Sequence, residues 1–407
     1  MLNEDLNTES TETRKCPVSH QRVLPTDGTP LKPSPTLAEW AKEGKASPLS
    51  FTDDHQGWIV TDHALARDLL VDSRFSQLPQ RIPGALTQVA FGDQEPDERA
   101  EEASRLAGLL AIDGPEHARI RRTILGKFSV RAAKGHEPKV REIVNKQISH
   151  LSAIGPGVDL EHEYSNPIST AVHGHVLGIP EHLQDKYYRL FAGDSSQAEK
   201  VYFVREVLEI KRLNPDDSVL GEMIKSDLSE VEEEGLAFVL FVSGRDSVAY
   251  MITTTTVALL QNPSELEKLR NDSSLIPAAI EEFMRYGAMF LTLFSRTATE
   301  DVELQGFRFS KGDSVAVSPV AANRNAQVFP DPNQFDVTRD AFGHLGFGHG
   351  IHGCVGQQLA RVELRVAIES LISKFPKLRL LEAEQNRPMD FAHPVATYKA
   401  GRATVSW

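Results

Sequence analysis

Residues 347–364 read FGHGIHGCVGQQLARVEL, and this stretch decides the fold. Cys354 stands within it, among the glycines Gly346, Gly348, Gly350, Gly353 and Gly356. Glycine has no Cβ, so a backbone rich in glycine can lie close against a planar ligand. A helical pattern follows from near Gln357 to Phe375, and Pro376 stands directly after it.

The position of Cys354 near the start of this helix gives its sulfur a chemical use. Free N–H groups and the helix dipole stabilise a thiolate there. A thiolate in a glycine-rich loop is a good single ligand for a haem iron. The residues therefore predict a loop that lies against a flat ligand and offers it one sulfur.

Three other interpretations of the same stretch stay open at this point. Residues 348–353 satisfy the GxGxxG pattern of dinucleotide sites, although no strand signal precedes them. His344, His349, His352 and Cys354 could bind zinc, although their spacing matches no usual zinc pattern. The third interpretation is a structural loop with a buried cysteine, and the density of glycine argues against it.

The stretch resembles the haem loop of cytochrome P-450 monooxygenases of the soluble bacterial type. That family's pattern is Phe-Gly-x-Gly-x-His-x-Cys-x-Gly followed by Leu-Ala-Arg. The matching residues are Phe347, Gly348, Gly350, His352, Cys354, Gly356, Leu359, Ala360 and Arg361. The resemblance covers the chain from about residue 50 to its end. It implies a mainly α-helical fold with small antiparallel β-sheets, in which haem b lies between a long central helix and the cysteine loop, with Cys354 as axial ligand.

Composition favours one cytoplasmic globular unit. The chain has 407 residues and a net charge of −13, which argues against binding to nucleic acid or to an anionic membrane surface. Its two cysteines, Cys16 and Cys354, lie far apart and fit a reducing compartment. Residues 1–36 are polar and rich in proline, so we expect a flexible N-terminal arm and a single catalytic domain at residues 37–407.

A long apolar run from Gly235 to Leu260 predicts the central helix. Its length could cross a bilayer, but Arg245 and Asp246 at its centre would be costly in lipid, so we expect a core helix of a soluble protein. After about Met289, short alternating stretches with turns predict antiparallel strands.

Polar residues interrupt the central helix at SGRDS, where serine and glycine can loosen its hydrogen-bond ladder. The resemblance makes Asp246 the acid and Ser247 the alcohol that deliver protons during oxygen activation. The family has Ala-Gly-x-Asp/Glu-Thr at this place. Ser243 therefore adds a polar group beside the pocket, and Ser247 keeps the hydroxyl but loses the methyl group that restricts its rotamer.

The spacing of Glu282 and Arg285 matches the structural Glu–Arg ion pair of the family. Taken alone, such a pair is an ordinary contact between neighbours on a helix surface. The family adds an arginine before the Phe of a later DPxRFD segment, where this chain has Gln334. Arg324 is the candidate that we consider for the missing third member.

The resemblance also assigns haem contacts and a substrate pocket. The expected haem contacts are His117, Arg121, Arg296, Phe347, Gly348, His352 and Gly356, of which His117, Arg121, Arg296 and His352 match propionate partners. The expected pocket residues are Leu86, Val89, Leu240, Ser243, Gly244, Phe290, Leu291, Leu293 and Thr397. This set is mainly apolar with one or two hydroxyls, which suits a hydrophobic substrate with a polar handle.

The implied reaction inserts one oxygen atom from O2 into a C–H bond of a hydrophobic small molecule. We prefer steroid-like or terpenoid substrates, with fatty acids next. No flavin or nicotinamide domain fits in the chain, so electrons from NAD(P)H are expected through a ferredoxin and its reductase. A basic patch could receive an acidic ferredoxin, and its candidate members are Arg119, Arg122, Lys127, Arg361 and Arg365.

Two alternatives keep the same haem site. One is a haem-thiolate protein with other chemistry, such as a peroxide-driven reaction or oxidative coupling. The other is a haem-binding protein without catalysis. The retained acid and alcohol, Asp246 and Ser247, favour oxygen activation.

Overall fold

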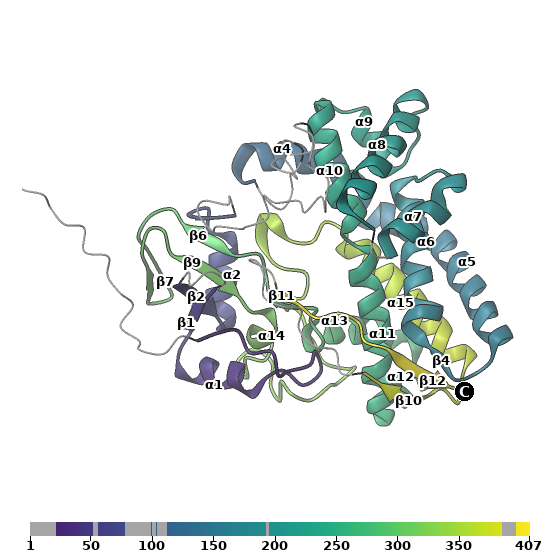
Figure 1. The fold of residues 1–407 in the computed structure, drawn as a ribbon. Coiled ribbons are helices and arrows are strands. Elements are labelled where there is room, and N and C mark those ends of the chain that lie inside the picture. Colours follow the sequence, from purple (N-terminus) through teal and green to yellow (C-terminus); the bar gives the residue numbers. More distant parts are fainter. Residues whose placement is uncertain are drawn as a thin grey trace, which may run out of the picture.

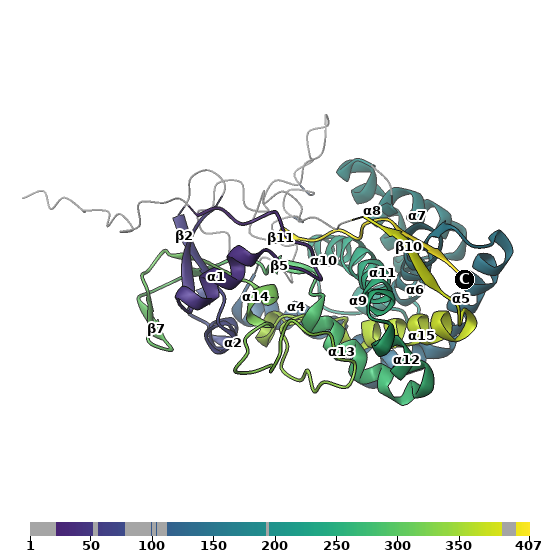
Figure 2. The ribbon, with the colours of Figure 1, turned by 90° about the horizontal axis from the view of Figure 1, so that it is seen from below.

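The structure is a computed structural model that describes residues 22–51, 56–77, 112–192, 195–384 and 396–407, together with Arg99 and Ala103. A five-stranded sheet with helices α1 and α2 lies on one side, and helices α5 to α8 lie on the other (Figures 1 and 2). The predicted pocket residues Leu86 and Val89 lie outside the described residues.

Helices make up most of the described chain, as the sequence predicts. Several begin at a serine whose side chain accepts a backbone N–H, and two of these serines, Ser196 and Ser229, form complete capping boxes with Glu199 and Glu232. The helices are α1 (Pro35–Glu43), α2 (His63–Val71), α4 (Gly114–Leu125), α5 (Val130–Ile154), α6 (Asn166–Leu177), α7 (Gln184–Ala192), α8 (Gln197–Leu213), α9 (Val219–Ile224), α10 (Glu230–Val242), α11 (Arg245–Gln261), α12 (Pro263–Asn271), α13 (Ile276–Tyr286), α14 (Pro319–Ala322) and α15 (Gln357–Lys374).

The strands are short and form small sheets. They are β1 (Ala46–Ser50), β2 (Gln56–Val60), β3 (Phe75–Ser76), β4 (Val158–Asp159), β5 (Phe290–Thr292), β6 (Arg296–Ala298), β7 (Val302–Leu304), β8 (Phe307–Phe309), β9 (Ser314–Val317), β10 (Arg379–Ala383), β11 (Ala396–Thr397) and β12 (Ala403–Ser406). The sheets have the orders β1-β2-β9-β6-β3, β10-β12-β4, β11-β5 and β7-β8.

One strand pair departs from the antiparallel pattern that we expected. Strands β2 and β9 run parallel, with Trp58 opposite Val315. These strands come from distant parts of the chain, so no tight turn forces them to be antiparallel. The described pairs otherwise run antiparallel.

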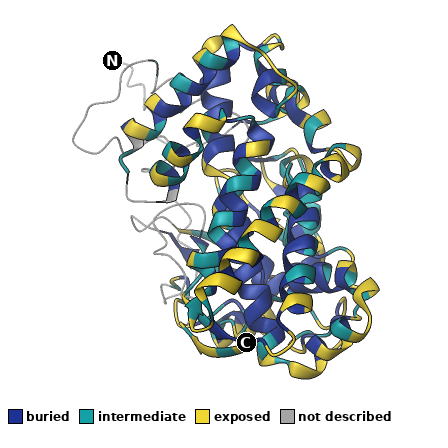
Figure 3. Cartoon of the chain, turned by 90° about the vertical axis from the view of Figure 1, so that its right-hand side faces the viewer, coloured by how far each residue is buried: buried dark blue, intermediate teal, exposed yellow. Residues whose placement is uncertain are grey.

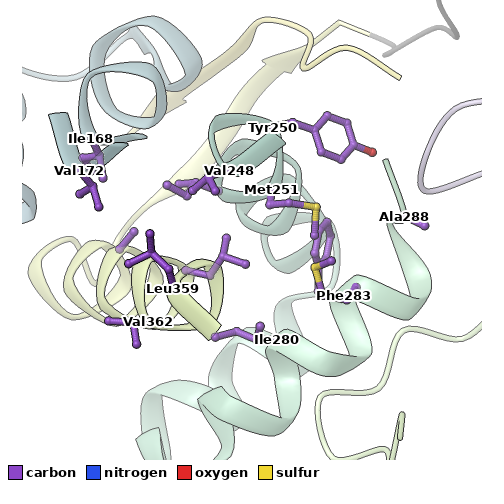
Figure 4. Packing of buried hydrophobic residues seen from close by; sticks show 14 of the residues in the cluster. Ile168, Val172, Val248, Tyr250, Met251, Ile280, Phe283, Ala288, Leu359 and Val362 are labelled. Atoms are coloured by element: carbon purple, nitrogen blue, oxygen red, sulfur yellow. The ribbon is translucent and has the colours of Figure 1, made fainter. Parts of the chain in front are cut away.

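The core is formed where α6, α11, α13 and α15 meet. Figure 4 shows Val172 of α6, Val248 of α11, Ile280 of α13 and Leu359 of α15 pointing toward one another. Exposed residues gather on the outer faces of the helices and buried ones face inward (Figure 3). Each fully buried aliphatic side chain stabilises the fold by about 1.5–3 kcal/mol before the entropy of ordering is subtracted.

The apolar stretch Glu230–Gln261 is long and apolar enough to cross a membrane, but most of it is buried within the protein, as in a core helix. It forms two helices rather than one. Helix α10 ends at Val242, and α11 begins at Arg245. The polar interruption predicted from the sequence is therefore a break, and Gly244 carries it with φ of +95°.

Part of the expected N-terminal arm lies against the body of the protein. In residues 22–36, the Leu24 side chain is buried, and the Arg22 carbonyl accepts the N–H of Ser50 at 2.7 Å. Residues 35 and 36 already belong to α1. Residues 1–21 lie outside the described residues.

Candidate active site

The starts of α11 and α15 are packed together. Val248, near the start of α11, lies beside Leu359, near the start of α15 (Figure 4). Asp246 precedes Val248 by two residues, and Cys354 precedes Leu359 by five. This packing brings the helix break and the cysteine loop into the same region of the molecule.

The cysteine loop is shaped by backbone contacts. The N–H of Cys354 donates to the carbonyl of Phe347 at 2.8 Å. Gly350 has φ of +75°, and a Cβ there would lie 2.6 Å from the carbonyl oxygen of Leu70 at the end of α2. The sequence suggested that the glycines admit a ligand, whereas this one is required by the backbone of α2.

Cys354 keeps solvent-accessible surface, although its thiol lies well below the surface of the protein with many neighbouring atoms. Burial raises the pKa of this thiol, and the N–H groups of Gly356 and Gln357 and the charge of Arg121 oppose the rise without cancelling it. The sequence led us to expect stabilisation of the thiolate by the helix start, but desolvation is the larger effect here. Coordination to a metal ion deprotonates such a sulfur outright.

Four groups predicted to bind haem propionates lie close together, and we name them the cationic cluster: His117, Arg121, Arg296 and His352. The rings of His117 and His352 have centroids 4.3 Å apart. Arg121 Nη2 donates to the carbonyl of Gly353 at 2.6 Å, which ties α4 to the cysteine loop. Arg296 enters from β6, where its Nη1 donates to the carbonyl of Phe75 at 3.4 Å.

Asp113 is the acidic partner of this cluster, and the sequence did not show it. It precedes α4 as a capping residue would, yet its side chain caps nothing. Its carboxylate binds His352 Nε2 at 2.8 Å and accepts the hydroxyl of Ser76 at 2.6 Å. Burial raises the pKa of Asp113, but these bonds and the N–H of Gln77 outweigh it and hold this pKa well below its usual range.

The cationic cluster holds buried nitrogen atoms that the described residues leave without a partner. Burial lowers the pKa of His117 to about 4, and the electrostatic influence of His352 and Arg121 adds to this. Burial also lowers the pKa of Arg296 to about 10. His117 Nε2 and Arg296 Nε are buried without a hydrogen-bond partner in the described chain. Buried polar nitrogens of this kind need a hydrogen-bond partner, and a carboxylate such as a haem propionate would supply one.

The helix break presents the two residues predicted to handle protons. The side chain of Asp246 is 62% exposed and forms an ion pair with the buried Arg245. The hydroxyl of Ser247 donates to the carbonyl of Gly244 at 3.2 Å. One residue thus offers an accessible carboxylate and the next an alcohol, at the point where the backbone leaves helical geometry.

Glu282 and Arg285 form a bidentate ion pair on α13, and both side chains are fully buried. Arg285 Nε and Nη2 donate to the carboxylate at 2.6 and 2.8 Å. The third member is Arg339, whose Nε donates to Glu282 Oε1 at 3.1 Å. Gln334 contributes its backbone carbonyl to Arg285 at 3.4 Å. We call Glu282, Arg285 and Arg339 the Glu282 network.

Our candidate for the third member was wrong. Arg324 donates instead to the carbonyl of Tyr286 at 2.8 Å, and its guanidinium lies 5.1 Å from the centre of that ring. Arg339 follows Gln334 by five residues, so the cation is supplied from a later position in the same loop.

The described pocket candidates lie in three parts of the fold. Leu240, Ser243 and Gly244 lie at the helix break, where Leu240 is buried and Ser243 is exposed. Phe290 and Thr397 are paired across β5 and β11, next to the buried Leu291. Leu293 packs against the cluster beneath the five-stranded sheet. Leu240 and Leu291 are therefore core residues, and the remaining members keep accessible surface.

The predicted basic patch is largely neutralised by carboxylates. Arg119 and Lys127 pair with Glu232 and Asp217. The other pairs are Arg361 with Glu281 at 2.5 Å and Arg365 with Glu137 at 2.5 Å, whereas Arg122 is exposed. Four of the five expected cations thus have an acidic neighbour, which sequence spacing could not show.

The zinc and dinucleotide interpretations of the cysteine loop find no support in the described residues. His344 pairs with Glu281 at 3.1 Å, and His352 pairs with Asp113. No three His, Cys, Asp or Glu side chains gather around a metal position in the described part of the chain. The nearest described strand before the loop is β9, which ends at Val317, so the loop does not follow a strand as a dinucleotide loop does.

Known proteins resemble this chain in sequence and in fold. Residues 226–401 match the family described as Cytochrome P-450. The chain is 31% identical over 392 residues to Cytochrome P-450-SU2 of Streptomyces griseolus, which covers 93% of this chain and 95% of that protein. It is 32% identical over 383 residues to pentalenic acid synthase of Streptomyces avermitilis, covering 89% and 92%. A vitamin D3 dihydroxylase of Streptomyces griseolus is 33% identical over 343 residues, covering 81% and 82%.

Solved structures agree with these relatives. The wild-type, ligand-free CYP105P1 structure superposes with a TM-score of 0.81 at 28% identity and covers 95% of this chain and 100% of that one. MoxA of Nonomuraea recticatena gives a TM-score of 0.80 at 28% identity, with 94% and 97% covered. The chain belongs to the cytochrome P-450 family and is a monooxygenase that hydroxylates small molecules. Membership implies haem as cofactor and redox partners that supply electrons.

Proposed function

We propose that this chain holds haem b through Cys354 and inserts one oxygen atom from O2 into a C–H bond of a hydrophobic, ring-containing small molecule in the bacterial cytoplasm. The single observation that carries this proposal is the pairing of two features. An accessible but deeply surrounded sulfur lies next to a buried cluster of donors, of which His117 Nε2 and Arg296 Nε lack partners among the described residues. Haem matches both features, because it joins an iron to two carboxylates.

When bound, haem supplies the oxygen-activation chemistry, which a cysteine thiolate promotes by donating electron density to the iron. The protein holds the cofactor at two places. Cys354 gives its sulfur, and Phe347, Gly348 and Gly356 belong to the loop around it. The cationic cluster would hold the propionates with hydrogen bonds, and Asp113 orients His352 within that cluster.

Proton delivery is assigned to Asp246 and Ser247. The carboxylate of Asp246 is accessible to water, and its ion pair with Arg245 holds it in place. The Ser247 hydroxyl can pass a proton because it both donates and accepts. Its bond to the Gly244 carbonyl keeps it at the break. Serine retains this function of the family's threonine, with a freer rotamer.

The substrate class is proposed from the pocket and from relatives. Of the expected pocket residues, Phe290, Leu293 and Thr397 keep partly accessible, mostly apolar surface, and the exposed Ser243 offers a hydroxyl. Such a pocket suits a hydrophobic body with one polar group. The relatives include a vitamin D3 dihydroxylase and a pentalenic acid synthase, which supports steroid-like or terpenoid substrates ahead of fatty acids.

Electrons are proposed to come from NAD(P)H through a ferredoxin and its reductase. Because Arg119, Lys127, Arg361 and Arg365 pair with carboxylates, docking depends on exposed Arg122 and shape more than on a broad positive field.

The test is reconstitution with a bacterial ferredoxin, its reductase and NADPH, after a panel of compounds has been screened by the spin-state change of the ferric haem. We expect a steroid-like or terpenoid compound to shift the spin state and to yield a product that carries one atom from labelled O2. Product formation from hydrogen peroxide alone, with none from O2 and NADPH, would contradict the proposal and favour peroxide-driven chemistry. Selective turnover of fatty acids would overturn the substrate class only.

A further inference from the structure

The break between α10 and α11 is held by side chains from another helix. In an unbroken helix the Leu240 carbonyl would accept the N–H of residue 244. Here it accepts from His173 of α6, with Nε2 at 2.7 Å. On the other side of the break, the Arg245 carbonyl accepts the hydroxyl of Ser169 at 2.5 Å. Ser169 and His173 are four residues apart, so both lie on one face of α6.

The His173 ring also fixes the shape of the backbone at the break. Gly244 has φ of +95°, and a Cβ at this residue would lie only 2.8 Å from His173 Cε1. The ring of Tyr187 stacks on the His173 ring, with centroids 6.3 Å apart and planes 21° apart. The imidazole is therefore held in one orientation, with Cε1 and Nδ1 nearest the turn of the backbone.

The charge state of His173 suits this function. Burial lowers the pKa of His173 to about 4, which the bond to Leu240 opposes and the charge of Arg245 reinforces. The ring is neutral near pH 7, and its protonated Nε2 faces the carbonyl while Nδ1 remains an acceptor. A neutral donor satisfies the Leu240 carbonyl without adding a second positive charge beside Arg245.

We propose that His173 is a positioning residue for proton delivery, which fixes the break from which Asp246 and Ser247 project. The proposal rests on the proposed function of those two residues. Arg245 connects α6 to the proton-delivery residues, because its carbonyl accepts a bond from α6 and its side chain pairs with Asp246. A shift of the backbone at Gly244 would therefore move the carboxylate and the hydroxyl together.

The test compares three variants of the haem-loaded protein. His173→Leu removes the donor and keeps similar bulk, and His173→Gln restores an N–H donor. His175→Ala is the matched control, because His175 lies two residues further along α6 and is exposed. The first readout is hydrogen exchange of the amides of residues 243–247, and the second is the fraction of NADPH electrons released as hydrogen peroxide.

We expect His173→Leu to lower amide protection at the break about tenfold, which corresponds to about 1.4 kcal/mol. The peroxide fraction should rise several-fold, while the spectrum of the reduced carbon monoxide complex stays unchanged. His173→Gln should recover much of both. If His173→Leu does not fold, His173→Gln is compared with His175→Ala instead. Amide protection lower, and peroxide release higher, in His173→Gln than in His175→Ala would then support the proposal, and equal values would overturn it.

Unchanged protection in His173→Leu would overturn the proposal, as would lower protection without any change in peroxide release. Asp246→Asn and Ser247→Ala separate this failure from that of the proposed function. If these two variants release more peroxide and His173→Leu does not, only the assignment of His173 is wrong. If neither Asp246→Asn nor Ser247→Ala releases more peroxide, the proton-delivery assignment is wrong, and the inference about His173 fails with it.

Discussion

The Glu282 network and the cationic cluster are both buried groups of charge near the cysteine loop, but they differ in how their donors are satisfied. In the network, Arg285 binds both oxygens of Glu282 and also the carbonyls of Asn323 and Pro332. In the cluster, His117 Nε2 and Arg296 Nε have no partner among the described residues. We interpret the fully bonded network as structural and the unpartnered nitrogens of the cluster as part of a ligand site.

The largest expected effect comes from breaking the network. Arg285→Ala leaves the fully buried Glu282 without its bidentate partner. Removing one member of a buried ion pair costs about 3–5 kcal/mol. We expect a matching loss in the free energy of unfolding by denaturant and a low yield of folded protein. Arg339→Ala is the control, because Arg339 is partly exposed and makes one bond to Glu282, so its loss should be smaller.

The pH dependence of the cluster should be the next largest effect. The pKa of His117 is about 4 in the folded protein, below its ordinary value of about 6.5. Between these values the unfolded chain binds a proton that the folded chain does not, so stability falls as the pH falls through this window. Neutral His117 thus accounts for about 3 kcal/mol of the free energy of unfolding that is lost between pH 7 and pH 4.

Chemical denaturation between pH 7 and pH 4 tests this, with His117→Gln as the comparison. The variant should show a shallower loss of stability. Haem should also make the slope shallower, because a neighbouring propionate raises the pKa of His117. If the free energy of unfolding of the variant falls with pH as steeply as that of the parent protein, His117 does not titrate in this way.

A smaller effect is expected on haem retention. Arg296→Leu removes a buried cation that has an unpartnered Nε, so the free energy of unfolding of the haem-free protein should change little or rise. Loss of a charge-assisted bond to a propionate costs about 1.5–3 kcal/mol, or about 10–100-fold in haem affinity. The rate of haem transfer to an acceptor protein measures this. If Arg296→Leu lowers the free energy of unfolding but does not speed haem transfer, Arg296 is a structural residue and not a haem ligand.

The smallest effect is expected at the paired surface cations. Exposed ion pairs contribute about 0–1 kcal/mol each, and the carboxylates beside Arg361 and Arg365 cancel most of their field. We expect the rate of reduction by ferredoxin to change only a few-fold between about 10 and about 150 mM salt. A steep fall with salt would restore the basic patch that the sequence suggested.

Sequence alone could predict what is local. The pattern around Cys354 is long and contiguous, so the loop and the final helix could be assigned from it. His117, Arg121 and Arg296 lie in other segments, and only the resemblance to the family pointed to them. The polar interruption in the central helix is equally local, and it is now seen as a break with Gly244 at a positive φ.

Relations between distant segments could not be predicted. Asp113 looks like a helix cap, and only folding brings it to His352, 239 residues away. Arg339 fills a place that the family pattern gives to position 334, because the loop folds back onto Glu282. His173 has no motif at all, and its importance depends on how α6 packs against the break.

The measurement that tests the central claim most directly is the spectrum of the reduced protein with and without carbon monoxide. If the Cys354 sulfur holds the haem iron as a thiolate, the Soret band of the carbon monoxide complex is strongly red-shifted, and Cys354→Ser loses this shift. A band at the ordinary haem position in the parent protein would mean a protonated or displaced sulfur. The absence of any haem band from the purified, haem-supplied protein would contradict the account as a whole.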